Sequence, residues 1–166
     1  MANIEHDFHD QIDNLGTETE RDHKAISRYF NLWRLRHQMH LNRLSNAKLH
    51  GISGEELTKE QQETLEVMHV GYVNSDGEIP ARQLTGGQIQ LGIDQLMLEF
   101  KDTRWGLLQA KKGHFLCADS YHELCIMPIS PKFAFAANLP DQILTYAEVA
   151  TVNKQSIESA KEFLFC

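Results

Sequence analysis

The sequence predicts an α+β fold in which N-terminal helices pack on a small antiparallel sheet of about four strands, and a C-terminal helix closes the chain. Three observations support this prediction. Apolar residues recur at helical spacing in the first part of the chain, short strand-like runs bounded by glycine and proline follow, and a capped helical segment comes last. The expected organisation is a single domain over 1–166, with a mainly helical part over 1–103, a β meander over 104–138 and a helix over 145–164.

The N-terminal part is expected to begin with a short helix and to continue into a long basic one. In residues 1–16, apolar side chains recur at spacings of four, four and three, namely at Ile4, Phe8, Ile12 and Leu15. The segment Thr17-Glu18-Thr19-Glu20 has the pattern of a capping box, which satisfies free N–H groups at a helix start. A long helix is therefore expected over about 21–48, with Gly51 as its stop.

Two further helices are expected before the strands. The capping-box pattern Thr58–Gln61 marks a shorter helix over about 57–70, and a turn signal follows at 74–77. Gly86-Gly87 marks a second break, after which a helix is expected over about 89–101. This last helix is apolar over most of its circumference, so we expect it to lie deep in the structure.

The character of the sequence changes at Arg104, where strand signals begin. Short apolar runs separated by turn residues predict strands over 105–108, 115–118, 124–127 and 133–136. Thr145–Glu148 then has the capping-box pattern, and we expect the C-terminal helix that it opens to reach about Phe163.

Composition excludes several classes of protein. The 42% hydrophobic and 23% charged residues are usual for a folded globular chain. No stretch approaches the roughly 20 apolar residues that a membrane helix requires, and the N-terminus lacks the pattern of a signal peptide. Three cysteines, an odd number, favour a reducing compartment, so we expect a cytoplasmic protein without contact to a membrane.

The net charge of −7 is arranged in blocks. Residues 1–20 contain six acidic and no basic side chains, residues 21–50 seven basic and one acidic, and residues 51–80 seven acidic and one basic, whereas residues 81–166 are nearly balanced. One interpretation is a set of solvated helix faces with local ion pairs, which are individually weak. The other is a surface that engages a partner of complementary charge.

The partner interpretation selects particular side chains. We expect the acidic blocks to meet a protein partner with a basic surface, and the arginines of the basic helix either to pair with the 51–66 segment or to meet a partner. Overall acidity argues against direct nucleic-acid binding, and an oligomer of the chain stays possible. The candidate partner-binding residues are Glu5, Asp7, Asp10, Asp13, Glu55, Glu56, Glu60, Glu63, Arg34, Arg36 and Arg43.

Several short motifs carry a resemblance to a known family. In the second half they are Trp105 to Leu116, Cys117-Ala118-Asp119, Met127-Pro128-Ile129-Ser130-Pro131, Val152-Asn153 and Ala160. In the first half they are Tyr29-Phe30 and the pair Arg34 and Arg36. The chain thereby resembles a large bacterial domain-of-unknown-function family. Its members have a tryptophan-led strand, a strand ending in Phe-Ile-Thr-Ser-Asp, a Pro-Leu-Ser-Pro bend and a closing helix that begins near an asparagine.

The chain also departs from this family. Members open with a His-Tyr-Val-Pro-x-Phe block that is missing here, Cys117 and Ala118 replace small hydroxyl residues, and Tyr121 stands where a proline is expected. If the family has a catalytic site built from the opening histidine and the strand-end aspartate, this chain keeps only Asp119. The resemblance therefore implies a shortened or repurposed member, of a size that phages and mobile elements often carry.

Nine histidines are the unusual count in the composition. His6 with His9 and His37 with His40 form two pairs at i, i+3, a spacing that puts two imidazoles on one helix face as a metal site requires. His23, Asp10 or Asp13 are the only further ligands that suggest themselves. Because no established ligand pattern supports them, we expect no metal and no other cofactor, with His37 as a hydrogen-bonded histidine at the core boundary.

Asp119, His122 and Glu123 follow directly on a predicted strand. A carboxylate at a strand end beside a histidine can perform acid–base catalysis, so Asp119 and His122 are the catalytic candidates. Cys117 and Cys125, on neighbouring predicted strands, allow a Cys–His nucleophile. The alternative is a plain turn, which Asp and Ser favour, next to small buried cysteines.

Two weaker signals complete the candidates. Gly86-Gly87 before a helix can cradle an anion, but it lacks the spacing of a nucleotide-binding loop. Tyr29 and Trp33 are interleaved with arginines, as in some nucleic-acid-binding helices, but they fall on the apolar stripe, which favours internal packing.

Two hypotheses of function follow. The first is a non-enzymatic acidic protein that binds and inhibits a bacterial machine that handles nucleic acid, in its sharpest form an anti-CRISPR protein. The second is a hydrolase or nuclease that uses Asp119 and His122. The charge layout and the absence of a complete catalytic motif favour the first.

Overall fold

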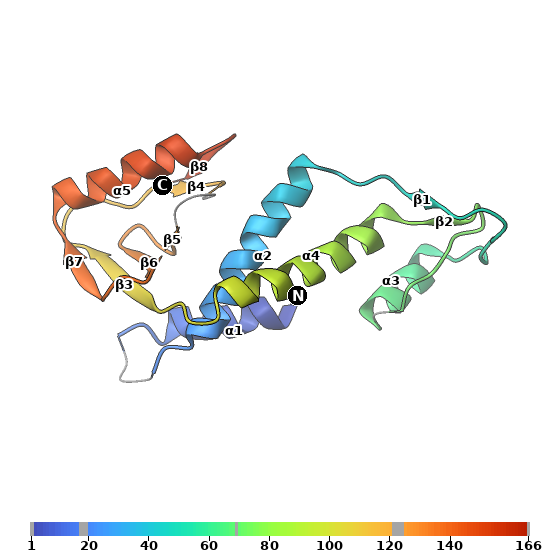
Figure 1. Cartoon of the computed structure of the whole chain (residues 1–166), viewed down its shortest axis with the longest axis horizontal. Coiled ribbons are helices and arrows are strands. Elements are labelled where there is room, and N and C mark those ends of the chain that lie inside the picture. The colour runs from blue at the N-terminus through green and yellow to red at the C-terminus, as the bar shows by residue number, and fades with distance from the viewer. Residues whose placement is uncertain (1, 17–19, 69, 121–124, 166) are drawn as a thin grey trace.

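The computed structural model describes residues 2–16, 20–68, 70–120 and 125–165 of the chain. It confirms the α+β class, with helices and several small sheets (Figure 1). The helices in the described part are α1 (Ala2–Asp13), α2 (His23–Leu41), α3 (Lys59–Val67), α4 (Ala81–Glu99) and α5 (Tyr146–Ser159). None of them is both long and apolar enough to cross a membrane.

The largest sheet is mixed, not antiparallel as the sequence suggested. Its order is β5-β6-β3-β7, from β5 (Ile126–Pro128), β6 (Phe133–Ala137), β3 (Trp105–Ala110) and β7 (Gln142–Leu144). β6 is antiparallel to both β5 and β3, whereas β7 is parallel to β3. The chain leaves β6, crosses the end of β3 and returns on its other side. Gly106 permits this crossing, because a Cβ there would overlap the carbonyl group of Leu139.

The predicted strand over 115–118 does not join this sheet. Only its last part forms β4 (Cys117–Ala118), which pairs antiparallel with β8 (Leu164–Phe165) at the end of the chain. We did not expect β7 or β8, and the C-terminal helix ends at Ser159 instead of reaching Phe163. The predicted strand over 124–127 is partly confirmed by β5, and its first residue lies outside the described part.

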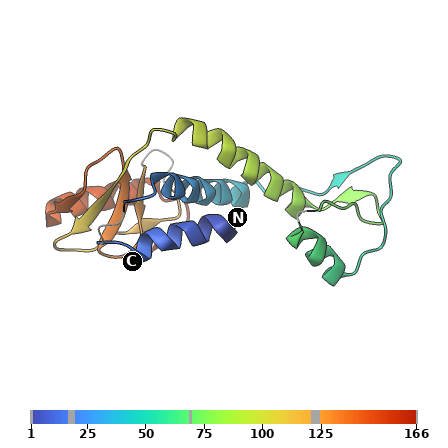
Figure 2. The same cartoon turned by 90° about the horizontal axis from the view of Figure 1, so that it is seen from below.

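The sheet lies between α1 and α2 on one face and α5 on the other (Figure 2). Successive side chains of β3 point to opposite faces, as the pleat requires. Trp105 packs with Phe30 and Phe135 on the face covered by α1 and α2, whereas Leu108 packs with Val149 on the opposite face, which α5 covers. A third cluster joins α1, α2 and α4, from Ile4, Leu32, Leu35, Ile89 and Ile93.

Polar contacts fix the start of α2 on the sheet. Arg21 donates hydrogen bonds to both carboxylate oxygens of Asp141, at 2.9 and 3.1 Å, and to the carbonyl oxygen of Trp105 at 2.7 Å. The backbone N–H of Trp105 donates to Nδ1 of His23 at 3.0 Å, and its indole N–H donates to the buried Oγ of Ser27 at 2.8 Å. These bonds satisfy backbone and side-chain groups that the core would otherwise leave unpaired.

The helix predictions hold in outline and fail at several ends. α1 is confirmed. α2 ends at Leu41 rather than near Gly51. Its C-cap is Asn42, whose backbone leaves the helical conformation (φ −115°, ψ 65°) and whose side chain donates to the carbonyl oxygen of Gln38. Its N-terminal cap is Asp22, and the capping box expected before it includes residues 17–19, which lie outside the described part.

The prediction of a deep helix over about 89–101 is wrong in both its start and its burial. α4 begins at Ala81, so Gly86-Gly87 lie within the helix and not before it. It is also not deep, since Leu91 is 70% and Leu98 is 73% exposed. The buried side chains of α4, Ile89 and Ile93, pack against α1 and α2. A helix that is apolar on most sides can still be exposed, because the sequence does not show how many other elements pack against it.

Residues 42–80, which we call the arm, extend from the ends of α2 and α4 away from the rest of the chain, which we call the body (Figure 1). The arm contains α3 and the two-stranded antiparallel sheet of β1 (Ala47–Lys48) and β2 (Glu78–Ile79). The capping box of Thr58 with Gln61 and the turn at 74–77 are confirmed there. No described residue of α3 is buried.

Candidate functional site

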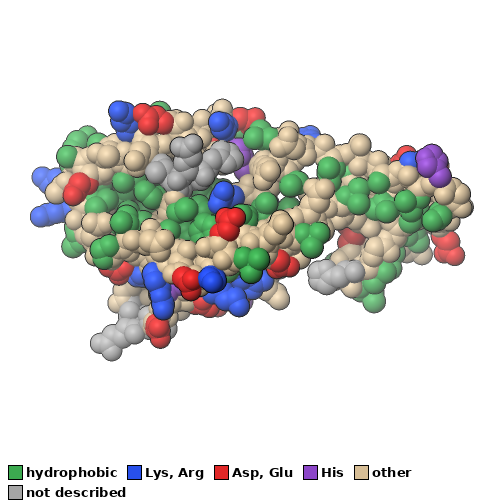
Figure 3. Space-filling view, in the orientation of Figure 1, with side chains coloured by type: hydrophobic (Ala, Val, Ile, Leu, Met, Phe, Trp, Pro, Cys, Tyr) green, Lys and Arg blue, Asp and Glu red, His purple; other side chains and the backbone are tan. Residues whose placement is uncertain are grey.

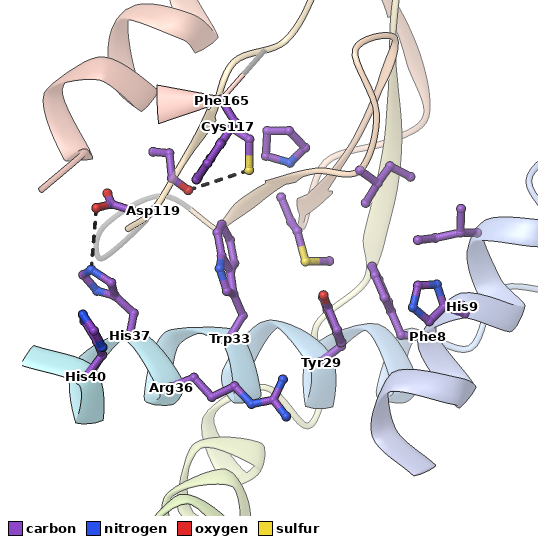
Figure 4. A pocket seen from close by; sticks show the side chains of 15 residues that line it. Phe8, His9, Tyr29, Trp33, Arg36, His37, His40, Cys117, Asp119 and Phe165 are labelled. Carbon is purple, nitrogen blue, oxygen red and sulfur yellow. Dashed lines mark hydrogen bonds and ion pairs between the residues drawn. The ribbon is translucent and has the colours of Figure 1, made fainter. Parts of the chain in front are cut away.

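A cavity of about 530 Å³ opens between α1, α2 and the two-stranded sheet of β4 and β8. Figure 4 shows it from close by, with Trp33 in the middle, His37 and Asp119 to one side and Phe8 and Tyr29 to the other. The segments that line it are far apart in the sequence, from α1 to Phe165 near the end of the chain. Most of its wall is apolar, as in ordinary small-molecule sites.

One face of α2 forms the floor of this cavity. Tyr29, Trp33, His37 and His40 follow one another at spacings of four, four and three, which places them along a single stripe of the helix. The stripe is aromatic toward the start of the helix and carries imidazoles toward its end. Tyr29 stacks on Phe8 of α1, with 3.8 Å between the ring centroids, and this contact closes the aromatic end.

Asp119, the candidate catalytic carboxylate, lies in the opposite wall. It accepts three backbone hydrogen bonds from the C-terminal segment: Oδ1 from Lys161 at 2.9 Å, and Oδ2 from Glu162 at 2.6 Å and Phe163 at 3.0 Å. Burial raises the pKa of this carboxyl, but the three N–H groups and the nearby His37 outweigh it, so the pKa lies below its ordinary value. A carboxylate with a lowered pKa is a weaker base, and its contacts hold β8 against β4.

The histidine that faces Asp119 is His37. Its Nε2 lies 3.8 Å from Oδ2 of Asp119, and the two side chains are only 12% and 8% exposed (Figure 4). The other proposed partners of Asp119, His122 and Glu123, lie outside the described residues. The sequence predicts His37 at the core boundary, which agrees with its low exposure, but no signal in the sequence links it to a residue so distant in the chain.

Three of the four histidines of the two i, i+3 pairs line the same cavity. His9, His37 and His40 all line the cavity, whereas His6 is exposed and lies 3.7 Å from Asp10 one turn along α1. Among the described residues, no group of three or more His, Cys, Asp or Glu side chains is arranged to hold a metal ion.

The described part of the chain contains two of the three cysteines, Cys117 and Cys125, and they lie at different places. Cys117 lines the cavity, and its Sγ lies 3.7 Å from the carbonyl oxygen of Ala118. Burial raises the pKa of the Cys125 thiol, which makes the nucleophilic thiolate scarcer at neutral pH.

Among the residues that the structure describes, the arginines of the basic segment 21–48 form no ion pair with the acidic 51–66 segment. Arg36 forms an ion pair of 2.6 Å with Glu5 of α1, and Arg34 lies over the ring of Phe30 at 5.7 Å. Arg43 lines a separate hollow between α2 and α4. The acidic segment instead meets Arg82 of α4, through an ion pair of 2.6 Å with Glu66.

The remaining acidic candidates face solvent to different degrees. Asp10 and Asp13 are exposed on α1, and Asp7 is half-buried. Glu55, Glu56, Glu60 and Glu63 are all exposed on the arm. Within the described part of the chain, the arm therefore carries the more accessible of the two acidic blocks.

Asn153, Ser130 and Asp119 belong to the motifs from which a family resemblance was expected, and each has structural contacts in this chain. Asn153 of α5 accepts the backbone N–H of Leu116 and donates to the carbonyl oxygen of His114, both at 2.8 Å. Ser130 accepts the N–H groups of Lys132 and Phe133 and shapes the turn between β5 and β6. Together with Asp119, these side chains hold loops whose backbone groups lack partners in a sheet.

Comparison of the chain with protein-family models, with curated proteins and with solved structures found no significant match. The geometry of the cavity and of the arm therefore carries the functional conclusion.

Proposed function

We propose that this protein is a non-enzymatic binding protein whose acidic arm engages a basic surface of a protein partner. The observation that carries the proposal is the position of the acidic 51–80 block on a segment that extends from the body (Figure 1). Residues 42–80 contain seven acidic and three basic side chains. An isolated cluster of one charge attracts an oppositely charged surface over several ångströms and accelerates association.

The arm also exposes apolar side chains between its acidic groups. Val67 is 80% and Met68 is 65% exposed at the end of α3, and Ile52 is 55% exposed in the preceding loop. Figure 3 shows acidic and hydrophobic side chains together on the arm. Interfaces combine such an apolar centre with a charged rim, since burial supplies affinity and charge supplies orientation.

The sharpest form of this proposal is an inhibitor of a bacterial nucleic-acid-handling complex, such as an anti-CRISPR protein, in the cytoplasm. Proteins that bind DNA or RNA carry basic grooves, and an acidic arm can occupy such a groove in place of the phosphate backbone.

The hydrolase alternative has weaker support. Asp119 is held by three backbone N–H groups, and its pKa is lowered, whereas a general base works best with a pKa near the operating pH.

Affinity purification from bacterial lysate with paired variants tests the proposal. In the arm variant, four exposed glutamates become lysine: Glu55→Lys, Glu56→Lys, Glu60→Lys and Glu63→Lys. The control changes net charge equally, at exposed acids of the body: Asp94→Lys, Glu99→Lys, Asp102→Lys and Glu158→Lys.

We expect one protein to be recovered in stoichiometric amount with the wild type and the control, and to be lost with the arm variant. Recovery should also fall as salt is raised from low to high concentration, because screening weakens exposed charges. Equal recovery with both variants, or no stoichiometric partner at low salt, contradicts the proposal.

A further inference from the structure

We infer that the cavity between α1, α2 and β4 is a binding site for a small amphipathic organic anion, a carboxylate on an aromatic or branched aliphatic body. This site is separate from the acidic arm and does not depend on the function proposed for it. The cavity volume of about 530 Å³ lies within the range of ligand pockets, roughly 300–1,000 Å³.

The aromatic end of the cavity fits the apolar body of such a ligand. Phe8, Tyr29 and Trp33 line the cavity there, and Met127 and Ile129 complete the wall. Figure 4 shows Trp33 projecting from α2 into the space between the two walls. A flat ring placed beside it gains both burial and offset stacking.

The polar end of the cavity fits an acceptor. Arg36, His37 and His40 line the cavity together with Asp119, and these three side chains present N–H donors, whereas His9 lies beside Phe8 at the aromatic end (Figure 4). Arg36 uses one terminal nitrogen for Glu5, and a guanidinium has five N–H donors in total. A ligand whose polar group only accepts hydrogen bonds is therefore the complement of this end.

Asp119 does not reverse this preference. Both of its oxygens accept backbone N–H bonds from residues 161–163, and Oδ2 also lies beside Nε2 of His37. The negative charge is thus directed toward the C-terminal segment and the imidazole. Arg36 and His40 are both exposed on the same side of α2, one turn apart, and are accessible to a ligand carboxylate.

The two tryptophans allow the site to be located directly. Trp33 lines the cavity, whereas Trp105 is 1% exposed and its indole N–H is bonded to Ser27. The indole N–H signals in a ¹H–¹⁵N spectrum therefore distinguish binding in the cavity from binding elsewhere. Ser27→Ala assigns the Trp105 signal.

The probes are 2-naphthoate and 2-naphthamide, which share a ring system and differ in charge. We expect 2-naphthoate to shift the Trp33 signal and not the Trp105 signal, with a Kd at least about tenfold lower than that of the amide, as one charge-assisted hydrogen bond provides. Arg36→Gln should remove most of this preference and His40→Gln part of it.

Glu5→Gln is the matched control. It breaks the same ion pair as Arg36→Gln but leaves the guanidinium in place, so it should keep or increase the preference for the carboxylate. An unshifted Trp33 signal, equal Kd values for acid and amide, or an unchanged preference in Arg36→Gln would each overturn the assignment.

Discussion

The body and the arm are built on different principles. The body buries large apolar side chains in three clusters around the sheet and helices, including Trp105, Phe30 and Phe135. In the described part of the arm, Tyr72 is the one buried hydrophobic side chain, and no residue of the arm belongs to these clusters. Since burial is the main favourable contribution to folding, the two regions should differ widely in stability.

Within the residues described, the arm is stabilised by hydrogen bonds around Tyr72 and not by an apolar cluster of its own. The Tyr72 hydroxyl lies 3.1 Å from the side-chain oxygens of Gln62 and Glu66 on α3, and Arg82 of α4 donates to it at 2.6 Å. Gln83 accepts the backbone N–H of the same tyrosine. The network joins α3 to the start of α4, and its bonds are directional but individually modest.

The arm is therefore an ordered segment with a low free energy of local unfolding. Opening the arm exposes little apolar surface, so it costs much less than opening the body. A segment of this kind can adjust to a partner surface while the body stays folded.

Removal of a body side chain should have the largest effect. Trp105→Ala is expected to lower the free energy of unfolding by about 3–5 kcal/mol, because it leaves a cavity among Phe30, Phe100 and Phe135 and orphans Ser27. Denaturant unfolding followed by circular dichroism measures this. Trp33→Ala, at the half-buried tryptophan of the cavity, should cost clearly less, and equal losses would contradict the ranking.

Asp119 tests whether polar contacts also secure an edge of the body. Asp119→Ala removes the acceptor of three backbone N–H groups and should cost about 1.5–3 kcal/mol, as for bonds to a charged group. Amide hydrogen exchange at residues 161–163 should rise strongly. Asp102→Ala, at a carboxylate that is 88% exposed, should stay within about 0.5 kcal/mol of the wild type. Unchanged exchange at residues 161–163 would show that β8 is held by other contacts.

Tyr72→Phe should loosen the arm and leave the body alone. Loss of the hydroxyl removes bonds worth about 1 kcal/mol in total, so amide exchange in α3 should accelerate about fivefold while exchange in β3 stays unchanged. Tyr146→Phe, at an exposed tyrosine of α5, is the control. If exchange in β3 rose together with that in α3, the two regions would unfold as one unit.

The smallest effect is a pH dependence confined to the body. Burial, followed by the charges of Arg104 and Arg21, lowers the pKa of His23 below its ordinary 6.5. The unfolded chain therefore binds the proton first, so stability is complete above pH 6.5 and declines as pH falls through the folded pKa. His23→Asn should flatten this decline between pH 7 and 5.5, as measured by denaturant unfolding. An identical decline in the variant would assign it to other groups.

At more acidic pH, two carboxylates of the body should also make its stability depend on pH. Asp119 and Asp141 both have lowered pKa values, Asp141 chiefly through its hydrogen bonds with Arg21. Their contributions are complete above the ordinary value near 4 and are lost as pH falls below it. Both lie in the body, so acid should weaken the body at its polar contacts.

The elements that can be predicted from the sequence are those whose stabilising contacts are local. Thr58 with Gln61 and Thr145 with Glu148 form the expected capping boxes, because each box closes hydrogen bonds within four residues. The helix α1 and the strand β3 were likewise visible from their spacing alone. The sequence does not predict the end of α2 at Leu41, because Asn42 is one of several polar residues in 42–50 and nothing in its local pattern distinguishes it as the C-cap.

Which distant segments meet follows from the packing of the whole chain and cannot be predicted from local patterns. β7 lies beside β3, Asp119 faces His37, and α4 is covered on a single side, all through contacts between residues far apart in the chain. The extension of the arm was equally hidden, since its charge pattern is the same whether the segment folds back or projects outward. The pairing of distant segments depends on the apolar surface that the whole chain buries. The spacing of apolar residues along the sequence indicates only which of them share a face of one helix or strand.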